Sequence, residues 1–384
     1  MKKTIILLLL IFSAFVSYSC VNIDEPIIDD SENIKLLTGT DLTSEYIIWN
    51  GRHLFKDDRQ YFYNTATGFI ICFDGREVII SLILENSNQD IYFSIFKDKE
   101  VLLDSNVFSI SDSEDILISF DEPGIHYIEL VKRSEPQDGE TSLKSIETNG
   151  TFKKIEKEEK PHFLLLGASG ISGHGALGLP NTPRSTANSS SLHSFGYLTA
   201  KNFNGTVEFV SNSGWGVAFG FNNQSTTNNI LNAYDYYGIS SSEKLIGENY
   251  EHNNYIPDVI IVNAGGNDYS AVINKLTGFE KQNKIDEFKA AVFSLLMKLR
   301  TDAPDALIIW TMTSGSLNGN AALSVINQLE QVDKAHIHMI VIKDVGEGAP
   351  AGANGHCSYL THQLSAEVLS DAIEQFSKLK RVVN

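Results

Sequence analysis

One serine stands where the chain passes from an apolar run into a glycine-rich turn. The stretch Pro161–Gly175 reads PHFLLLGASGISGHG, in which the apolar residues after His162 predict a short buried strand and Ser169 follows it between glycines. Enzymes with α/β folds place reacting groups on such bends, where small neighbours let a substrate approach the backbone amides. The alternative is a tight turn without a chemical role.

Three further loops with polar or glycine residues follow predicted strands. NSGWG, which contains Gly214, follows TVEFVS, and GGND, which contains Asn267, follows DVIIVNA. His356 comes after HIHMIVI, at the end of a loop that precedes the last predicted helix. Because the carboxyl ends of parallel strands share one edge of a sheet, we expect the four loops to converge.

These residue types together permit acyl transfer. Imidazole is the usual base for a serine hydroxyl near neutral pH, so His356 would activate Ser169. The amides of Ser169 and Gly214 and the side-chain amide of Asn267 could donate to the oxyanion of the tetrahedral intermediate. Each residue alone has a structural alternative. Gly214 could be only a turn residue, Asn267 could cap the next helix, and His356 is one of ten histidines. Their occurrence in successive loops favours the catalytic interpretation.

The segment 162–384 supplies the elements that would position these loops. Its apolar strands FLLL, TVEFVS, DVIIVNAG, ALIIWTM and HIHMIVI alternate with helical stretches, which predicts a parallel sheet covered on both faces, a three-layer α/β/α domain. The helical stretches are clearest at 285–300, where apolar residues recur at three- and four-residue spacing, and at 361–376, where Thr361 is a candidate cap.

The segment 34–151 has a different character. Short runs rich in Ile, Val, Phe and Tyr are separated by Gly, Asn, Asp and Pro, which predicts an all-β sandwich or jelly-roll domain. Residues 152–161 are charged and end at Pro161, so we expect a linker between two domains. A chain of 384 residues also exceeds what one hydrophobic core usually supports.

The first residues have the pattern of an export signal. Lys2 and Lys3 precede an apolar run that ends in SYSC, so residues 1–19 are expected to be a signal peptide. The end of this run resembles the lipobox of bacterial lipoproteins, in which Cys20 would be lipidated and residues 20–33 would form a tether. We therefore expect an exported lipoprotein of the cell envelope that contacts the membrane only through its lipid anchor; a plain secretory signal is the alternative.

The charge and the cysteine content of the chain limit the classes of partner that it is expected to bind. The formal net charge of −18 disfavours nucleic acids and anionic membrane surfaces. Besides Cys20, the cysteines are Cys72, within an apolar run, and Cys357, and their spacing indicates neither a disulfide framework nor a metal site. We expect no cofactor and no metal. The oligomeric state does not follow from the sequence.

The order Ser–Gly–Asn–His in four blocks resembles the SGNH (GDSL-like) hydrolases. Within them the chain is most similar to carbohydrate esterase family 2, which joins a jelly roll to an SGNH domain and deacetylates plant polysaccharides. The resemblance rests on WNGR (49–52), YFYNTATGF (61–69), HYIELVKRSE (126–135), LHSFGYLTAKNF (192–203), NSGWG, PDVIIVNAGGNDY (257–269) and the spacing of His356 and His362. It implies Ser169 as nucleophile, His356 as base and acid, and an oxyanion hole of Ser169, Gly214 and Asn267.

The chain departs from this family at two places. Ala168 replaces the usual Asp before the nucleophile, and Ala353 and Asn354 occupy the positions where an Asp usually orients the histidine. We therefore predict a Ser169–His356 dyad, oriented either by a carbonyl of residues 350–354 or by the side chain of Asn354. An aromatic face suits a pyranose, so Trp215 could contact substrate; a core role is the alternative.

The sequence thus predicts an esterase that removes O-acetyl groups from plant-type polysaccharides or oligosaccharides. Two other hypotheses stay open: a carbohydrate-binding lipoprotein of the same fold with weakened or lost catalysis, and an esterase for other acyl esters. Three departures from the family pattern favour the binding protein: Ala168, Asn354, and Cys357 in place of the Pro that commonly follows the histidine. The presence of all four block residues argues against it.

Overall fold

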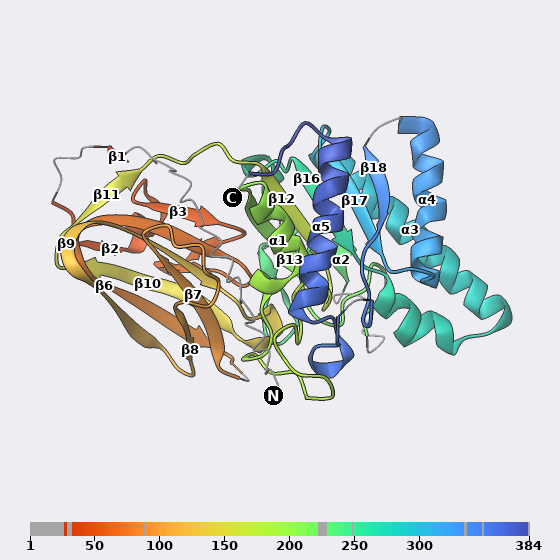
Figure 1. The fold of residues 1–384 in the computed structure, drawn as a ribbon, viewed down its shortest axis with the longest axis horizontal. Helices are drawn as coiled ribbons and strands as arrows, with labels where there is room; N and C mark the ends of the chain where they lie inside the picture. The colour runs from red at the N-terminus through yellow and green to blue at the C-terminus, as the bar shows by residue number, and fades with distance from the viewer. Residues whose placement is uncertain are drawn as a thin grey trace, which may run out of the picture.

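The computed structural model describes residues 27–28, 33–87, 89–221, 229–247, 249–333, 336–347 and 349–382. Cys20 and the predicted signal peptide lie outside these residues. In the described part, none of the helices has the length and apolar character needed to cross a membrane. The chain forms an antiparallel half and an α/β half that lie side by side (Figure 1).

The first half is a curled antiparallel sheet, as the strand-like runs predicted. Its long strands β6 and β9 pair along most of their length, and a register shift between Gly75 and Glu77 interrupts that pairing. The strands are β1 (Ile27–Ile28), β2 (Leu36–Thr38), β3 (Ile47–Asn50), β4 (Leu54–Lys56), β5 (Arg59–Tyr61), β6 (Gly68–Glu85), β7 (Ile91–Lys97), β8 (Val107–Ile110), β9 (Glu114–Lys132), β10 (Glu140–Thr148) and β11 (Thr151–Ile155).

The charged run after Thr151 is in part a strand. Residues 151–155 form β11, which pairs with β6 on one side and with the short β1 on the other. Phe152 is fully buried in the core of this half, whereas the lysines beside it are only partly buried. The predicted boundaries of the linker and the tether are therefore corrected here: only residues 156–161 connect the two halves without helix or strand.

The second half contains the predicted parallel sheet, in the order β13-β12-β16-β17-β18. Its strands are β12 (His162–Gly167), β13 (Thr206–Ser211), β16 (Val259–Asn263), β17 (Leu307–Met312) and β18 (Ile337–Val341). The first strand in the chain, β12, lies between β13 and β16, so the direction of strand addition changes there. In open α/β sheets a ligand site forms at such a switch point, outside the carboxyl ends of the strands.

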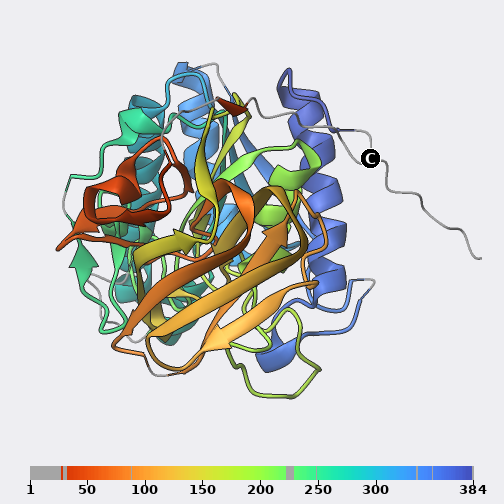
Figure 2. The same cartoon turned by 90° about the vertical axis from the view of Figure 1, so that its left-hand side faces the viewer.

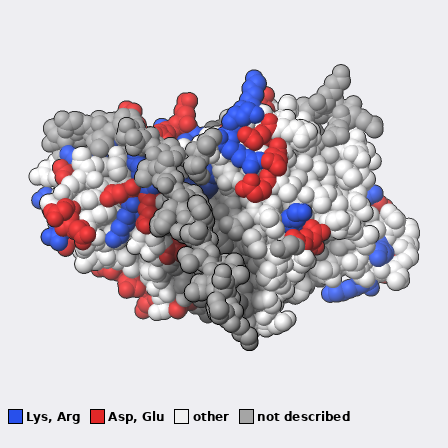
Figure 3. Space-filling view, in the orientation of Figure 1, with Lys and Arg blue, Asp and Glu red and all other residues white. Residues whose placement is uncertain are grey.

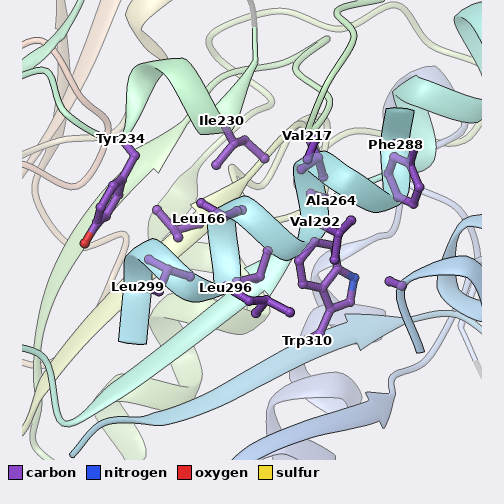
Figure 4. Packing of buried hydrophobic residues seen from close by; sticks show 14 of the residues in the cluster. Leu166, Val217, Ile230, Tyr234, Ala264, Phe288, Val292, Leu296, Leu299 and Trp310 are labelled. Carbon is purple, nitrogen blue, oxygen red and sulfur yellow. The ribbon is translucent and has the colours of Figure 1, made fainter. Parts of the chain in front are cut away.

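Helices cover both faces of this sheet, which confirms the predicted α/β fold. They are α1 (Phe195–Asn202), α2 (Ile230–Ala233), α3 (Gly278–Asp302), α4 (Leu317–Asp333) and α5 (Tyr359–Phe376). Alternate residues of β12 face opposite sides: Leu164 and Leu166 pack with α3, whereas Phe163 and Leu165 pack with α1 and α5. Figure 4 shows Leu166 and Trp310 packed against α3.

Short elements complete the fold. They are the two-stranded pair β14 (Gly238–Ile239) and β15 (Leu245–Ile246), the 3₁₀ turns η1 (Gly39–Thr43), η2 (Pro136–Asp138), η3 (Ser191–His193), η4 (His252–Asn254), η6 (Ile273–Lys275) and η7 (Ala353–Gly355), and the π-helical η5 (Asp268–Val272). The last helix starts two residues before Thr361: its cap position is Ser358, and Thr361 is buried, so the predicted cap is wrong.

Buried polar contacts join the two halves. Arg52, which follows β3, donates to Glu208 of β13 at 2.8 Å and lies over the ring of Tyr250. The hydroxyl of Thr65 donates to Ser191 at 2.6 Å. In Figure 2 the antiparallel half faces the viewer and the α/β half lies behind it. On the face in Figure 3, acidic and basic side chains are intermixed and form no large patch of one sign.

Candidate active site

Ser169 lies in the turn that directly follows β12. The turn is closed by two backbone hydrogen bonds, from Ser172 N to Ala168 O and from His174 N to Ser169 O, each 3.1 Å long. The hydroxyl of Ser172 also donates to Ser211 at the end of β13, 2.9 Å away. Ser169 is half-buried. Its amide and its hydroxyl have no hydrogen-bond partner among the described residues, so both are available to a substrate.

His356 is oriented by a backbone carbonyl. Its Nδ1 lies 3.0 Å from the carbonyl oxygen of Asn354. A carbonyl can only accept, so Nδ1 must carry the proton of the neutral ring, and Nε2 is left with a free lone pair. This is the tautomer that a general base needs. The carbonyl, and not the Asn354 side chain, fills the place of the usual carboxylate.

The conformation of Asn354 makes this contact possible. Its φ of +54° and ψ of 30° are left-handed, a conformation that asparagine tolerates better than most residues. The backbone around it is tied to the nucleophile turn, because Ala353 N donates to Gly175 O at 2.8 Å. The segment after β18 is thereby brought back to β12, as the convergence of loops predicts.

The structure places Ser169 and His356 in neighbouring segments without a hydrogen bond between them. His174, in the same turn as Ser169, has its ring centroid 4.2 Å from that of His356. Hydrogen bonds between nucleophile and base are often loose in free enzymes and tighten when substrate binds. Burial and the neighbouring His174 lower the pKa of His356, so the ring stays neutral to a lower pH than a free histidine.

Two of the predicted oxyanion donors, Gly214 and Asn267, lie in the loops after β13 and β16. Gly214 has a φ of +87°, which favours glycine, and its amide makes no hydrogen bond to another described residue. Asn267, after β16, donates one Nδ2 proton to the carbonyl of Trp215 at 2.7 Å, so its other Nδ2 proton remains for a ligand. Ser169, Gly214 and Asn267 thus lie in three loops linked by hydrogen bonds.

A buried carboxylate, Asp268, holds the rest of this loop. It accepts from the amides of Val217 and Ala218 at 2.8 Å and of Phe219 at 2.9 Å. A Cβ at Gly216 would come within 2.4 Å of Asp268, which explains the glycine there. The sequence interpretation missed this role, although a polar GGND block after a strand was a signal for it.

A second carboxylate reaches the site from the antiparallel half. Glu135 accepts from Ser213 N at 2.6 Å and from Ser213 Oγ at 2.8 Å. His174 Nδ1 lies 2.8 Å from Ser213 Oγ and 3.4 Å from Glu135. The side chain of Asn354 donates to His174 Nε2 at 3.2 Å. The sequence interpretation quoted Glu135 only as the last residue of the block 126–135 and assigned it no role in the site.

Trp310, His362 and the two described cysteines have positions that indicate structural roles. Trp310 is completely buried, and His362 packs against Phe195 with its Nδ1 accepting from the Phe195 amide. Cys72 is buried; Cys357 is partly buried, and burial raises the pKa of its thiol to about 11. Within the described ranges, no group of three or more His, Cys, Asp or Glu side chains is arranged to hold a metal ion.

Comparison with known proteins shows which families this chain is similar to. Residues 49–155 match the family described as Carbohydrate esterase 2 N-terminal. A cellulase/esterase, CelE, of Acetivibrio thermocellus is 23% identical over 338 residues, 85% of this chain and 39% of CelE. An acetylxylan esterase/glucomannan deacetylase of Cellvibrio japonicus is 24% identical over 262 residues, 67% of this chain and 69% of that protein. The chain therefore spans well under half the length of CelE.

A solved structure extends the likeness to the whole fold. A family two carbohydrate esterase from Clostridium thermocellum, in complex with cellohexaose, has a TM-score of 0.72 and 22% identity, and the match covers 86% of this chain and 98% of that one. The chain thus resembles carbohydrate esterase family 2, in sequence over residues 49–155 and in its overall fold. The predicted resemblance to this family of SGNH hydrolases is confirmed.

The burial of two side chains bears on the sequence predictions. Trp215 is 2% exposed and packs in the core on the α3 side of the sheet, so the predicted sugar contact through its ring is wrong and the core alternative holds. Ala168, in place of the usual Asp, is 8% exposed and belongs to the same core. The serine turn is therefore supported by apolar packing and by its backbone hydrogen bonds.

Proposed function

We propose that this chain is a carbohydrate acetyl esterase that removes O-acetyl groups from plant-type polysaccharides or oligosaccharides. The relatives support the enzyme class, an acetyl ester hydrolase. The observation that carries the mechanism is the contact of His356 Nδ1 with the Asn354 carbonyl, because it leaves Nε2 as a base beside the turn of Ser169. The cellohexaose bound to the Clostridium thermocellum esterase supports an oligosaccharide ligand.

The reaction divides into two acyl transfers. His356 Nε2 takes the proton of Ser169 as its oxygen attacks the acetyl carbonyl, and the amides of Ser169 and Gly214 and the Nδ2 of Asn267 stabilise the oxyanion. The imidazolium then protonates the leaving sugar oxygen, which breaks the ester bond and leaves acetyl-Ser169. Water, deprotonated by His356, attacks this intermediate; the bond to Ser169 then breaks, His356 returns the proton to the Ser169 oxygen, and acetate is released.

Acetate release from acetylated xylan and acetylated glucomannan tests the proposal. We expect the wild type to release acetate and Ser169→Ala to be slower by a factor on the order of 10⁶ in kcat. Ser324→Ala, on α4, is the matched control and should behave as wild type. Equal rates for wild type and Ser169→Ala would end the serine-esterase proposal.

The same assay separates the two alternatives. A carbohydrate-binding protein without catalysis would be slowed by the polysaccharide in affinity electrophoresis and would release no acetate. An esterase for other substrates would hydrolyse longer acyl esters and leave acetylated polysaccharides intact.

The jelly-roll assignment of the antiparallel half belongs to the same proposal and rests on its curled sheet of short and long strands.

We also propose that the chain is an exported bacterial lipoprotein anchored through Cys20. The basis is the N-terminal sequence, in which a basic start and an apolar run end at that cysteine. Incorporation of a labelled fatty acid into the wild type, and its loss in Cys20→Ala, is the expected result. Labelling of both proteins would overturn the assignment of Cys20.

A further inference from the structure

We propose that Glu135, from the antiparallel half, is a positioning residue of the esterase site that acts on both its oxyanion loop and its base. The proposal rests on the proposed function and adds a role for the antiparallel half. Glu135 is 1% exposed and lies between β9 and η2, outside the four blocks that form the site. It faces two of those blocks through a single carboxylate.

The first path leads to the oxyanion loop. Each carboxylate oxygen of Glu135 accepts one hydrogen bond from Ser213, at 2.6 Å from its amide and 2.8 Å from its hydroxyl. Ser213 directly precedes Gly214, whose amide is a proposed oxyanion donor. Hydrogen bonds to an ionised acceptor are about twice as strong as neutral ones, so this contact fixes the backbone next to the donor.

The second path leads to the base through two side chains. The amide nitrogen of Asn354 can only donate, so His174 Nε2 must accept, and Nδ1 of the neutral ring carries the proton. That proton points to Ser213 Oγ and Glu135, both of which can accept it. Glu135 thereby selects the His174 tautomer whose Nε2 accepts a hydrogen bond from the side chain of Asn354. The backbone carbonyl of the same Asn354 accepts from His356 Nδ1.

The surroundings keep this carboxylate charged although it is buried. Burial alone would raise the pKa of Glu135, but the hydrogen bond from His174, the charge of Arg184 and the hydrogen bond from Ser213 lower it below its ordinary value. Arg184, in the loop after the nucleophile turn, lies 3.4 Å from Glu135 and makes two contacts with Asp138. A buried carboxylate is costly unless it is paired in this way.

The charge also acts on His356 directly. His174 packs against its ring, and Glu135 from the antiparallel half and His362 from α5 are close enough to interact with it electrostatically. The negative charge of Glu135 favours the imidazolium that forms during each acyl transfer, whereas a proton on His174 opposes it. A residue that only joined the halves would not influence the protonation of His356.

Replacement of Glu135 by glutamine is the first test. Gln has one acceptor oxygen and turns an NH₂ group toward the donors of Ser213, His174 and Arg184. We expect kcat to fall about 10- to 100-fold, the range for lost orienting contacts, with KM little changed. Glu135→Asp retains the charge and should recover part of kcat.

The matched control is another buried carboxylate of the same half. Glu140 in β10 is 9% exposed and accepts from Asn86 and Ser241, away from His356. Glu140→Gln should therefore have the kcat of wild type. If Glu135→Gln and Glu140→Gln have the same kcat and KM as wild type, the positioning role is overturned.

Titration of His356 by ¹⁵N NMR on histidine-labelled protein gives a readout independent of turnover. We expect the pKa of His356 to be lower in Glu135→Gln than in wild type, because a nearby negative charge is lost, and unchanged in Glu140→Gln. An unchanged His356 titration in Glu135→Gln would contradict the proposal even if kcat fell. An inactive wild type with the expected NMR shift would end the proposed function and leave the positioning role supported.

Discussion

The two sides of the site are held in different ways. On the oxyanion side, the carboxylate of Asp268 accepts three backbone amides of residues 217–219, and Glu135 holds Ser213. On the base side, His356 is oriented by one backbone carbonyl, from the exposed Asn354 in a left-handed conformation. Buried carboxylates bond directly to the first side, whereas Glu135 reaches the second only through the side chains of His174 and Asn354.

This difference follows from what each side must do. Oxyanion stabilisation depends on donors that are already in place when charge develops, so rigid support is most valuable there. The base has to move a proton between a serine, a leaving oxygen and a water molecule. A carbonyl partner supports the required tautomer of His356 without a carboxylate bonded to its ring. We therefore expect substitutions on the oxyanion side to have larger effects than those beside the base.

Among the residues that support the nucleophile and base, the largest effect is expected at Asn267. Asn267→Ala removes one proposed oxyanion donor, and such a loss typically costs about 10²–10³ in kcat, or about 2.7–4 kcal/mol. Asn267→Asp is nearly isosteric but has no donor and places a negative charge near the oxyanion, so its loss should be at least as large. Steady-state kinetics with an acetyl ester measure both. A kcat for Asn267→Ala close to wild type would remove Asn267 from the oxyanion hole.

Asp268→Asn tests the support beneath that donor. Asn keeps one acceptor oxygen and turns an NH₂ group against a backbone amide of 217–219, so we expect a loss of about 1–3 kcal/mol in the free energy of unfolding. We also expect a fall in kcat smaller than that of Asn267→Ala. Asp258→Asn is the control, because Asp258 accepts the amide of His162 at the other end of the sheet. Urea unfolding measures the free energy of unfolding of both variants. An equal loss in Asp268→Asn and Asp258→Asn, with kcat unchanged in Asp268→Asn, would contradict the special role of Asp268.

Much of the fold follows from local sequence pattern. The five strands of the parallel sheet coincide with apolar runs, because strands buried on both faces contain few polar residues. In β11 the pattern is obscured, since lysines accompany the buried Phe152 on a strand with one exposed face. The place of β12 between β13 and β16 depends on packing between distant segments and has no local signal.

The site shows the same division. Ser169, Gly214, Asn267 and His356 follow predicted strands, so the sheet edge that gathers them can be inferred from the sequence. Glu135 belongs to the other half and contacts His174 across a sequence separation of 39 residues, for which no spacing rule exists. Trp215 was misassigned as a candidate because glycines flank it, although the apolar residues that follow it pack with it into the core.

A moderate effect is expected at Asn354. Asn354→Gly keeps the backbone carbonyl and accepts the positive φ, so only the contact of its side chain with His174 is lost, and we expect a fall in kcat of about tenfold. Asn354→Ala keeps the carbonyl too but adds the strain of a left-handed conformation, of order 1–2 kcal/mol. A loss of several orders of magnitude in Asn354→Gly would show that the side chain is itself essential.

The smallest expected effect is a shift in pH dependence, which reports on the base side alone. His356 must be neutral to accept a proton, and burial lowers its pKa, so the acidic limb of kcat/KM should lie below pH 6.5, the ordinary histidine value. A positive charge on the His174 ring, whose centroid is 4.2 Å from that of His356, opposes protonation of His356. His174→Gln removes that opposition, so the limb should move to higher pH, the direction opposite to that for Glu135→Gln. A limb that moves to lower pH in both variants would show that loss of position, and not charge, governs the protonation of the base.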